Sequence, residues 1–118
     1  MTLVFDEICI DAHDIHSLSQ WWSQVLGWQT EDTDDGDVLL RAPAGAGPPW
    51  LFISVPEGKS VKNRIHFDFR PDDQESEVAR VVALGARHVD IGQGDETWVV
   101  LADPEGNEFC ILAAGDAT

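Results

Sequence analysis

The two halves of this 118-residue chain repeat one order of predicted elements, and this duplication limits the possible fold most strongly. Each half reads strand, helix, strand, strand, strand. Each helix follows a capping aspartate, Asp14 in the first half and Asp73 in the second. Both helices end on a Leu-Gly pair, Leu26-Gly27 and Leu84-Gly85. A repeat of this kind indicates two like modules that share a sheet or a cavity.

The halves are interpreted as module one, residues 3–56, and module two, residues 63–113, of one domain that spans residues 1–118. Helices are predicted after Asp14 and over residues 73–84. The strands predicted in module one are 3–12, 28–30, 38–41 and 50–55, and those in module two are 65–70, 86–91, 97–101 and 107–112.

Residues 65–70 alternate strictly between apolar and polar side chains, which is typical of a half-buried strand. One face carries Ile65, Phe67 and Phe69. The other carries a base, an acid and a cation: His66, Asp68 and Arg70. A sheet face this polar is either solvated exterior or the lining of a site.

Charge excludes some classes of partner. The chain has 22 acidic and 7 basic residues, a net charge of −15, so it offers no basic stripe to a nucleic acid or an anionic membrane. No basic leader, apolar leader or spanning apolar run is present near Met1, and we expect a cytoplasmic protein. Cys9 and Cys110 form no metal-binding or disulfide pattern and are predicted to be free thiols.

Two of the five tryptophans are candidates for a binding site. Trp50 follows a Pro-rich loop, and Trp98 follows a Gly-rich acidic turn over residues 92–96. Aromatic walls with a few polar groups suit a flat organic ligand. Core packing or a subunit interface is the alternative for both residues.

Three stretches resemble the glyoxalase, bleomycin-resistance and extradiol-dioxygenase superfamily, also called vicinal oxygen chelate proteins. They are residues 22–28 (WSQVLGW), 63–69 (NRIHFDF) and 103–110 (DPEGNEFC), and the resemblance to its small bacterial glyoxalase-like branch covers roughly residues 3–113. The resemblance implies an α+β fold in which two βαβββ modules form a curled mixed sheet around a cavity, with helices on the outer face. It also implies a homodimer.

Superfamily enzymes typically hold a divalent metal with one ligand from each of four strands, and here that set is incomplete. The matching positions carry Glu7, His66 and Cys110, and the fourth strand offers no carboxylate or imidazole. We therefore predict no cofactor. If a divalent metal such as Zn, Ni, Fe or Mn is bound, Glu7, His66 and Cys110 would hold it.

The leading hypothesis is a protein of the bleomycin-resistance type that binds an aromatic or polycyclic organic compound without metal. Asp68 and Arg70 would fix the His66 imidazole and bind a ligand carboxylate or carbonyl. The predicted ligand-binding residues are Glu7, Trp50, His66, Asp68, Arg70, Trp98 and Cys110.

Whether the chain is an enzyme stays open at this point. One alternative is a metal-dependent lyase, isomerase or dioxygenase of the same superfamily. Another is a metal-free enzyme that uses Glu7 or His66 as a general base, or a Cys110–His66 nucleophile pair. The last is a regulatory or interaction module whose cavity is vestigial.

Overall fold

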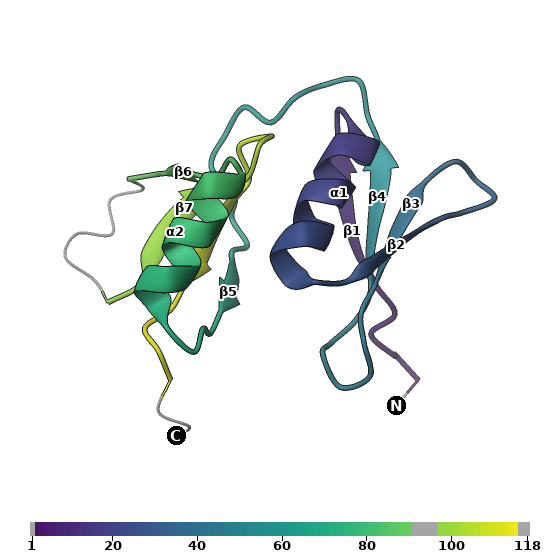
Figure 1. The fold of residues 1–118 in the computed structure, drawn as a ribbon. Helices are drawn as coiled ribbons and strands as arrows, with labels where there is room; N and C mark the ends of the chain where they lie inside the picture. The colour runs from purple at the N-terminus through teal and green to yellow at the C-terminus, as the bar shows by residue number, and fades with distance from the viewer. Residues whose placement is uncertain (1, 91–96, 116–118) are drawn as a thin grey trace. The chain divides into compact units, whose positions relative to one another are not determined.

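A computed structural model of the chain describes residues 2–90 and 97–115 and divides it into two units, Met1–Gly58 and Lys59–Thr118. Over the described residues, each unit consists of one helix and one four-stranded mixed sheet (Figure 1). The predicted α+β class with two βαβββ modules is therefore confirmed.

The first unit has the sheet order β1-β4-β3-β2, in which β1 runs parallel to β4 and the other pairs are antiparallel. Its core is aromatic, with Trp22, Trp50 and Phe52 buried between helix and sheet. Its elements are β1 (Ile8–Ala12), α1 (Ile15–Leu26), β2 (Gln29–Asp32), β3 (Val38–Arg41) and β4 (Trp50–Ser54).

The second unit has the corresponding order β5-β8-β7-β6, with β5 parallel to β8. Val81 of the helix is buried, as are Leu101 and Phe109 of the sheet. Its elements are β5 (Phe67–Phe69), α2 (Gln74–Leu84), β6 (Arg87–His88), β7 (Val99–Ala102) and β8 (Glu108–Ile111).

The register of the two parallel pairs preserves the duplication. Ile8 lies opposite Trp50, and Phe67 lies opposite Phe109, a separation of 42 residues in each case. Side chains two residues apart point to the same face of a strand, so equivalent positions of the two modules have equivalent orientations. The residues equivalent to Cys9 and Leu51 in the first unit are Asp68 and Cys110 in the second.

Both predicted helix caps are confirmed. The Asp14 carboxylate accepts a hydrogen bond from the Ser17 N–H, and Asp73 accepts one from Ser76 N–H. Gly27 ends α1 in the left-handed region at φ 72°, which a residue without Cβ adopts at low cost.

The first strand is shorter than the predicted 3–12. It begins at Ile8, whose N–H donates to the Pro49 carbonyl, and Leu3 before it is 97% exposed. The partner β4 is preceded by Pro48 and Pro49, which have no N–H to donate. The ladder therefore cannot extend toward residue 3 with regular hydrogen bonds.

The predicted strand 65–70 is also too long, because β5 covers only Phe67–Phe69. Ile65, predicted to share the inner face with the two phenylalanines, is 77% exposed. The reason lies on β8, where Glu108 bonds to Asn63 and turns the chain away from the ladder. His66 and Arg70 therefore flank the strand.

β3 has the predicted boundaries, and those of the remaining strands lie within three residues of the predicted ones, as is common where ladders fray. The predicted turn over residues 92–96 and the end of the predicted strand 86–91 lie outside the described residues. No helix in the described part of the chain is long and apolar enough to span a membrane.

Candidate functional site

The parallel register of β5 and β8 brings Asp68 and Cys110 together. They are Cα partners on adjacent strands, so their side chains lie side by side on one face of the sheet. Asp68 is exposed, whereas Cys110 is only 4% exposed. On the next strand Val100 lies opposite Cys110 and continues this face. We call it the Asp68 face, made of Asp68, Cys110 and Val100.

The surroundings of Cys110 keep its thiol protonated. Burial, the charge of Asp68 and a hydrogen bond with Asp68 together raise the pKa of Cys110 to about 11. Because the thiolate is the nucleophile and the metal ligand, a protonated thiol favours neither role at neutral pH. The S–H group instead acts as a hydrogen-bond donor beside a carboxylate acceptor.

Replacing Asp68 by Asn is expected to lower the pKa of Cys110, because the Asp68 charge that opposes thiolate formation is removed. The rate of thiol modification against pH, measured with Cys9→Ser as the background, reports this shift. Glu77→Gln is the matched control on α2. An unchanged pH profile in Asp68→Asn would contradict the coupling of these two side chains.

The raised pKa of Cys110 also predicts a loss of stability at high pH. The unfolded thiol ionises near its ordinary value of 9.0, whereas the folded thiol holds its proton to about 11. The part of the folding free energy that depends on this proton is therefore fully present below pH 9. It is lost as the pH rises toward 11, because the unfolded chain then releases the proton more readily than the folded protein.

Arg70 and His66 do not contact each other or Asp68 through any hydrogen bond of the described residues. Arg70 Nη1 donates to the Ala113 carbonyl at 3.0 Å, which ties the end of β5 to the chain after β8. His66 Nε2 lies 3.0 Å from the Asn63 carbonyl oxygen. The imidazole therefore contacts the Asn63 carbonyl, and a role of Asp68 and Arg70 in fixing it stays a prediction.

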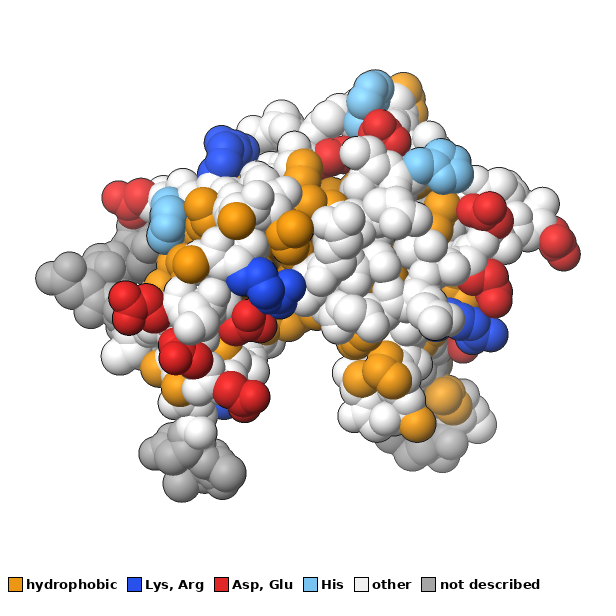
Figure 2. Space-filling view, viewed as in Figure 1, with side chains coloured by type: hydrophobic (Ala, Val, Ile, Leu, Met, Phe, Trp, Pro, Cys, Tyr) orange, Lys and Arg blue, Asp and Glu red, His pale blue; other side chains and the backbone are white. Residues whose placement is uncertain are grey.

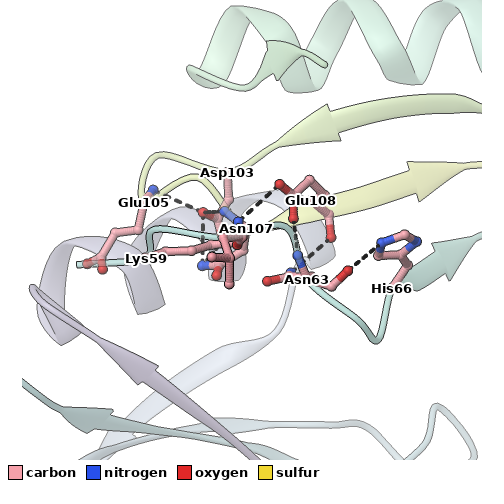
Figure 3. Close-up of polar contacts among 8 residues, drawn as sticks. Lys59, Asn63, His66, Asp103, Glu105, Asn107 and Glu108 are labelled. Carbon is pink, nitrogen blue, oxygen red and sulfur yellow. Dashed lines mark hydrogen bonds and ion pairs between the residues drawn. The ribbon is translucent and has the colours of Figure 1, made fainter. Parts of the chain in front are cut away.

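Sequence reasoning missed a polar network beside His66. Lys59, Asn63 and Glu108 join the chain before β5 to the first residue of β8 (Figure 3). An alternating polar residue in a predicted strand, as Glu108 is, gives no sign of such a role. The one recognisable motif near this network is the Asp-Pro-Glu-Gly-Asn turn, which directly precedes Glu108 in the sequence.

The first unit carries a second thiol and carboxylate pair. Cys9 Sγ donates to Glu7 Oε2 at 3.4 Å, and Glu7 is half-buried just before β1. Burial, the hydrogen bond to Glu7 and nearby carboxylate charges raise the pKa of Cys9. Glu7 precedes Asp14 by seven residues, as His66 precedes Asp73, so the two occupy equivalent places in their modules.

The two tryptophans chosen from the sequence differ in their surroundings. Trp50 is 4% exposed, and its ring centroid lies 5.1 Å from that of Trp22 and 5.8 Å from that of Trp28. It is part of the core of the first unit. Trp98 is half-buried directly before β7, two residues ahead of Val100, and it is the one tryptophan in the sequence of the second half.

The described donor side chains do not gather into a metal site. Residues 2–90 and 97–115 contain no group of three His, Cys, Asp or Glu side chains that could hold an ion. In the second unit, Cys110 would have to lose a proton that burial and Asp68 retain. Within the second unit His66 and Cys110 supply two donors, fewer than the three protein ligands of a typical zinc site. Glu7, His66 and Cys110 stay the donors expected if a metal is bound.

The acidic composition is visible on the surface. On the face that Figure 2 shows, red Asp and Glu side chains are spread over both units, and blue Lys and Arg side chains are few. Several of the cations are paired, as Arg41 is with Glu31 and Arg80 with Glu77. This surface offers no basic patch for a polyanion.

Comparison with known proteins gives one family. The family model of the glyoxalase-like domain matches residues 7–112. No curated protein matches the chain significantly.

Solved structures with the same fold cover nearly all of the chain. The fosfomycin resistance protein FosX from Listeria monocytogenes, in complex with Mn(II) and 1S,2S-dihydroxypropylphosphonic acid, is 13% identical with a TM-score of 0.72, over 98% of this chain and 93% of that one. TnmS3, an antibiotic binding protein from Streptomyces sp. CB03234, is 17% identical with a TM-score of 0.67, over 98% and 99%.

A third solved structure is described as a glyoxalase/bleomycin resistance protein/dioxygenase family enzyme from Burkholderia phytofirmans PsJN. It is 21% identical with a TM-score of 0.68, over 90% of this chain and 94% of that one. At these identities the similarity shows a shared fold.

Proposed function

This chain belongs to the glyoxalase-like domain family, and we propose that it binds a small organic molecule, as proteins of the bleomycin-resistance type do, without a metal. The observation that carries the proposal is the Asp68–Cys110 pair. At the position where family resemblance predicts a metal-binding carboxylate, the chain has a buried thiol whose pKa is raised to about 11. Such a group donates a hydrogen bond, and it would have to release its proton to ligate an ion.

The Asp68 face and its borders offer the groups that an organic ligand needs. Asp68 accepts hydrogen bonds, Cys110 and Arg70 donate them, and Trp98 supplies a half-buried aromatic ring. A few polar groups beside apolar and aromatic surface are typical of ligand sites. The described surroundings therefore support an aromatic or polycyclic ligand bound through Asp68, and the fold shared with TnmS3 agrees with this proposal.

The remaining predicted ligand residues, His66, Glu7 and Trp50, are proposed to have different roles. His66 is included because it leads directly into β5. Glu7 belongs to the first unit, and its contact with the same ligand stays a prediction. Trp50 packs against other rings in the core, so its proposed part is to support the first unit. The homodimer and the cytoplasmic location also stay predictions.

Tryptophan fluorescence tests the proposal. A panel of aromatic and polycyclic compounds is titrated into protein treated with chelator, and at least one compound is expected to quench the emission. Trp98→Phe should abolish most of the ligand-dependent change, whereas the half-buried Trp28 replaced by Phe is the matched control. Asp68→Asn should weaken binding roughly tenfold, since one charge-assisted hydrogen bond is lost.

Two results would count against the binding function. One is a panel in which no compound changes the emission. The other is quenching that survives in Trp98→Phe and disappears in Trp28→Phe, which would place the ligand on the first unit.

A metal-dependent lyase, isomerase or dioxygenase is the second candidate, supported by the fold shared with FosX, whose structure contains Mn(II). Elemental analysis of protein purified without chelator separates the two candidates. We expect less than stoichiometric Zn, Ni, Fe and Mn. A stoichiometric metal that is lost in His66→Ala would favour the enzyme.

A further inference from the structure

One glutamate ties the segment before β5 to β8. Glu108 Oε1 accepts a hydrogen bond from the Asn63 N–H at 2.8 Å, and Oε2 accepts one from Lys59 Nζ at 3.0 Å. The Glu108 carbonyl also accepts from Asn63 Nδ2 at 3.4 Å. In Figure 3 these bonds converge on Glu108 at the start of its strand. Both carboxylate oxygens and the backbone of Glu108 therefore hold the segment that carries His66.

The environment of Glu108 keeps its carboxylate charged. Burial alone would raise its pKa, but hydrogen bonds from the Asn63 N–H and Lys59 and the charge of Lys59 together hold the pKa below its ordinary value. The side chains of Lys59 and Glu108 are 18% and 10% exposed. A shielded ion pair with two further hydrogen bonds is better ordered than an exposed pair. The stabilisation of the fold by the Lys59–Glu108 pair is present above the ordinary carboxyl pKa. It is lost as the pH falls below that value and Glu108 becomes protonated.

The partner of His66 determines which ring nitrogen carries the proton. A carbonyl oxygen only accepts hydrogen bonds, so Nε2 must donate to the Asn63 carbonyl across their 3.0 Å separation. In the neutral ring, Nδ1 is then the acceptor. No described residue is bonded to Nδ1. Asn63 is at the same time the residue that Glu108 holds through its N–H and its side chain.

We propose that Glu108 is a positioning residue for His66: by fixing Asn63, it orients the imidazole and leaves Nδ1 as the acceptor offered to a ligand. The part that concerns the ligand rests on the proposed function. The part that concerns the ring does not, because the chain of contacts from Glu108 through Asn63 to His66 lies within the second unit.

The exchange of the His66 Nε2 proton with water measures this positioning without any ligand. The ring signals of the four histidines are recorded by long-range ¹H–¹⁵N correlation at about pH 8, where free imidazole is neutral, and His66→Gln assigns the signal. The signal is expected on Nε2. Glu108→Ala should speed its exchange roughly tenfold, the effect of losing about one hydrogen bond that limits opening.

Three variants show whether the effect is specific. Glu108→Gln keeps an oxygen for the Asn63 N–H and should restore slow exchange, to within about threefold of the parent protein. Glu108→Asp keeps the charge but is one methylene shorter, and should speed exchange as Ala does. Glu77→Ala removes another ion-paired glutamate of the same unit and should leave His66 unchanged.

Unchanged exchange in Glu108→Ala would overturn the proposal, as would equal acceleration in Glu77→Ala. If Glu108→Ala does not fold, Glu108→Asp decides in the same way. A protonated Nδ1 in the parent protein would also overturn it.

Ligand affinity separates this inference from the proposed function. With a compound found by Trp98 quenching, Glu108→Ala should raise Kd roughly tenfold. Faster proton exchange with an unchanged Kd would uphold the positioning of His66 and remove His66 from the ligand site. If no compound binds, the proposed function fails, and the exchange measurement still decides the role of Glu108.

Discussion

Trp50→Ala is expected to lower the free energy of unfolding by about 3–5 kcal/mol, the usual cost of truncating a large buried aromatic side chain. Trp50 is 4% exposed and lies at the centre of the ring cluster of the first unit. Its ring centroid is 5.1 Å from Trp22, 5.8 Å from Trp28 and 6.5 Å from Phe52, in edge or tilted contacts. Close-packed surroundings relax only partially after such a truncation, so a cavity adds to the lost burial.

Urea unfolding followed by circular dichroism measures this effect. Trp98→Ala is the matched control because Trp98 is only half-buried, and its loss should cost clearly less. The comparison also separates the two interpretations of Trp50 that the sequence left open. A Trp50→Ala protein that keeps its stability and loses ligand binding would show that Trp50 serves the ligand and that its core role is wrong.

Asp103→Ala should lower the free energy of unfolding by about 3 kcal/mol, because it removes the acceptor around which the β7–β8 turn is built. Asp103 is 1% exposed, and its Oδ1 accepts from the N–H groups of Glu105 and Asn107 at 2.9 and 3.0 Å. Asn107 Nδ2 donates to both carboxylate oxygens (Figure 3). Gly106 completes the turn at φ 89°, a conformation that favours glycine.

Thermal or urea unfolding tests this second effect with a graded pair of variants. Asp103→Asn keeps one oxygen for the backbone donors and should cost about 1 kcal/mol. Glu105→Ala keeps the Glu105 backbone N–H that donates to Asp103 and should cost clearly less than Asp103→Ala. Equal stability of Asp103→Ala and Glu105→Ala would show that the hydrogen bonds to Asp103 do not hold the turn.

Local signals in the sequence predicted much of the fold. The capping aspartates and Leu-Gly ends delimit both helices because caps depend on residues within one turn. The third strand, Val38–Arg41, has the boundaries that the sequence predicts. The duplication could be recognised because the capping aspartates and the Leu-Gly pairs recur at equivalent positions in the two halves.

The ends of the edge strands could not be predicted, because they depend on the partner strand. Residues 3–5 are apolar and β-prone enough for a strand, but the prolines before β4 offer this segment no N–H donor. Ile65 has the period of an inward residue, yet Glu108 takes Asn63 out of the ladder. Alternation of apolar and polar residues shows only that a segment is able to form a strand. Where the strand ends depends on the hydrogen-bonding groups of the neighbouring strand.

The site was predictable in its residue types more than in its contacts. Alternation placed Asp68 on a polar face, and the register then brought Cys110 beside it. The raised pKa of Cys110 depends on burial, which spacing alone does not give. The bond from His66 to Asn63 depends on a turn that no short motif announced.

The most direct test of the central claim is nuclear magnetic resonance of the metal-free protein, whose mass of 13.0 kDa suits the method. Backbone ¹H–¹⁵N spectra are recorded after chelator treatment, with and without a compound that quenches Trp98. We predict shifts concentrated at Asp68, Cys110 and Val100. Shifts that avoid β5 and β8, or that arise only after Zn²⁺ or Mn²⁺ is added, would contradict metal-free binding at the Asp68 face.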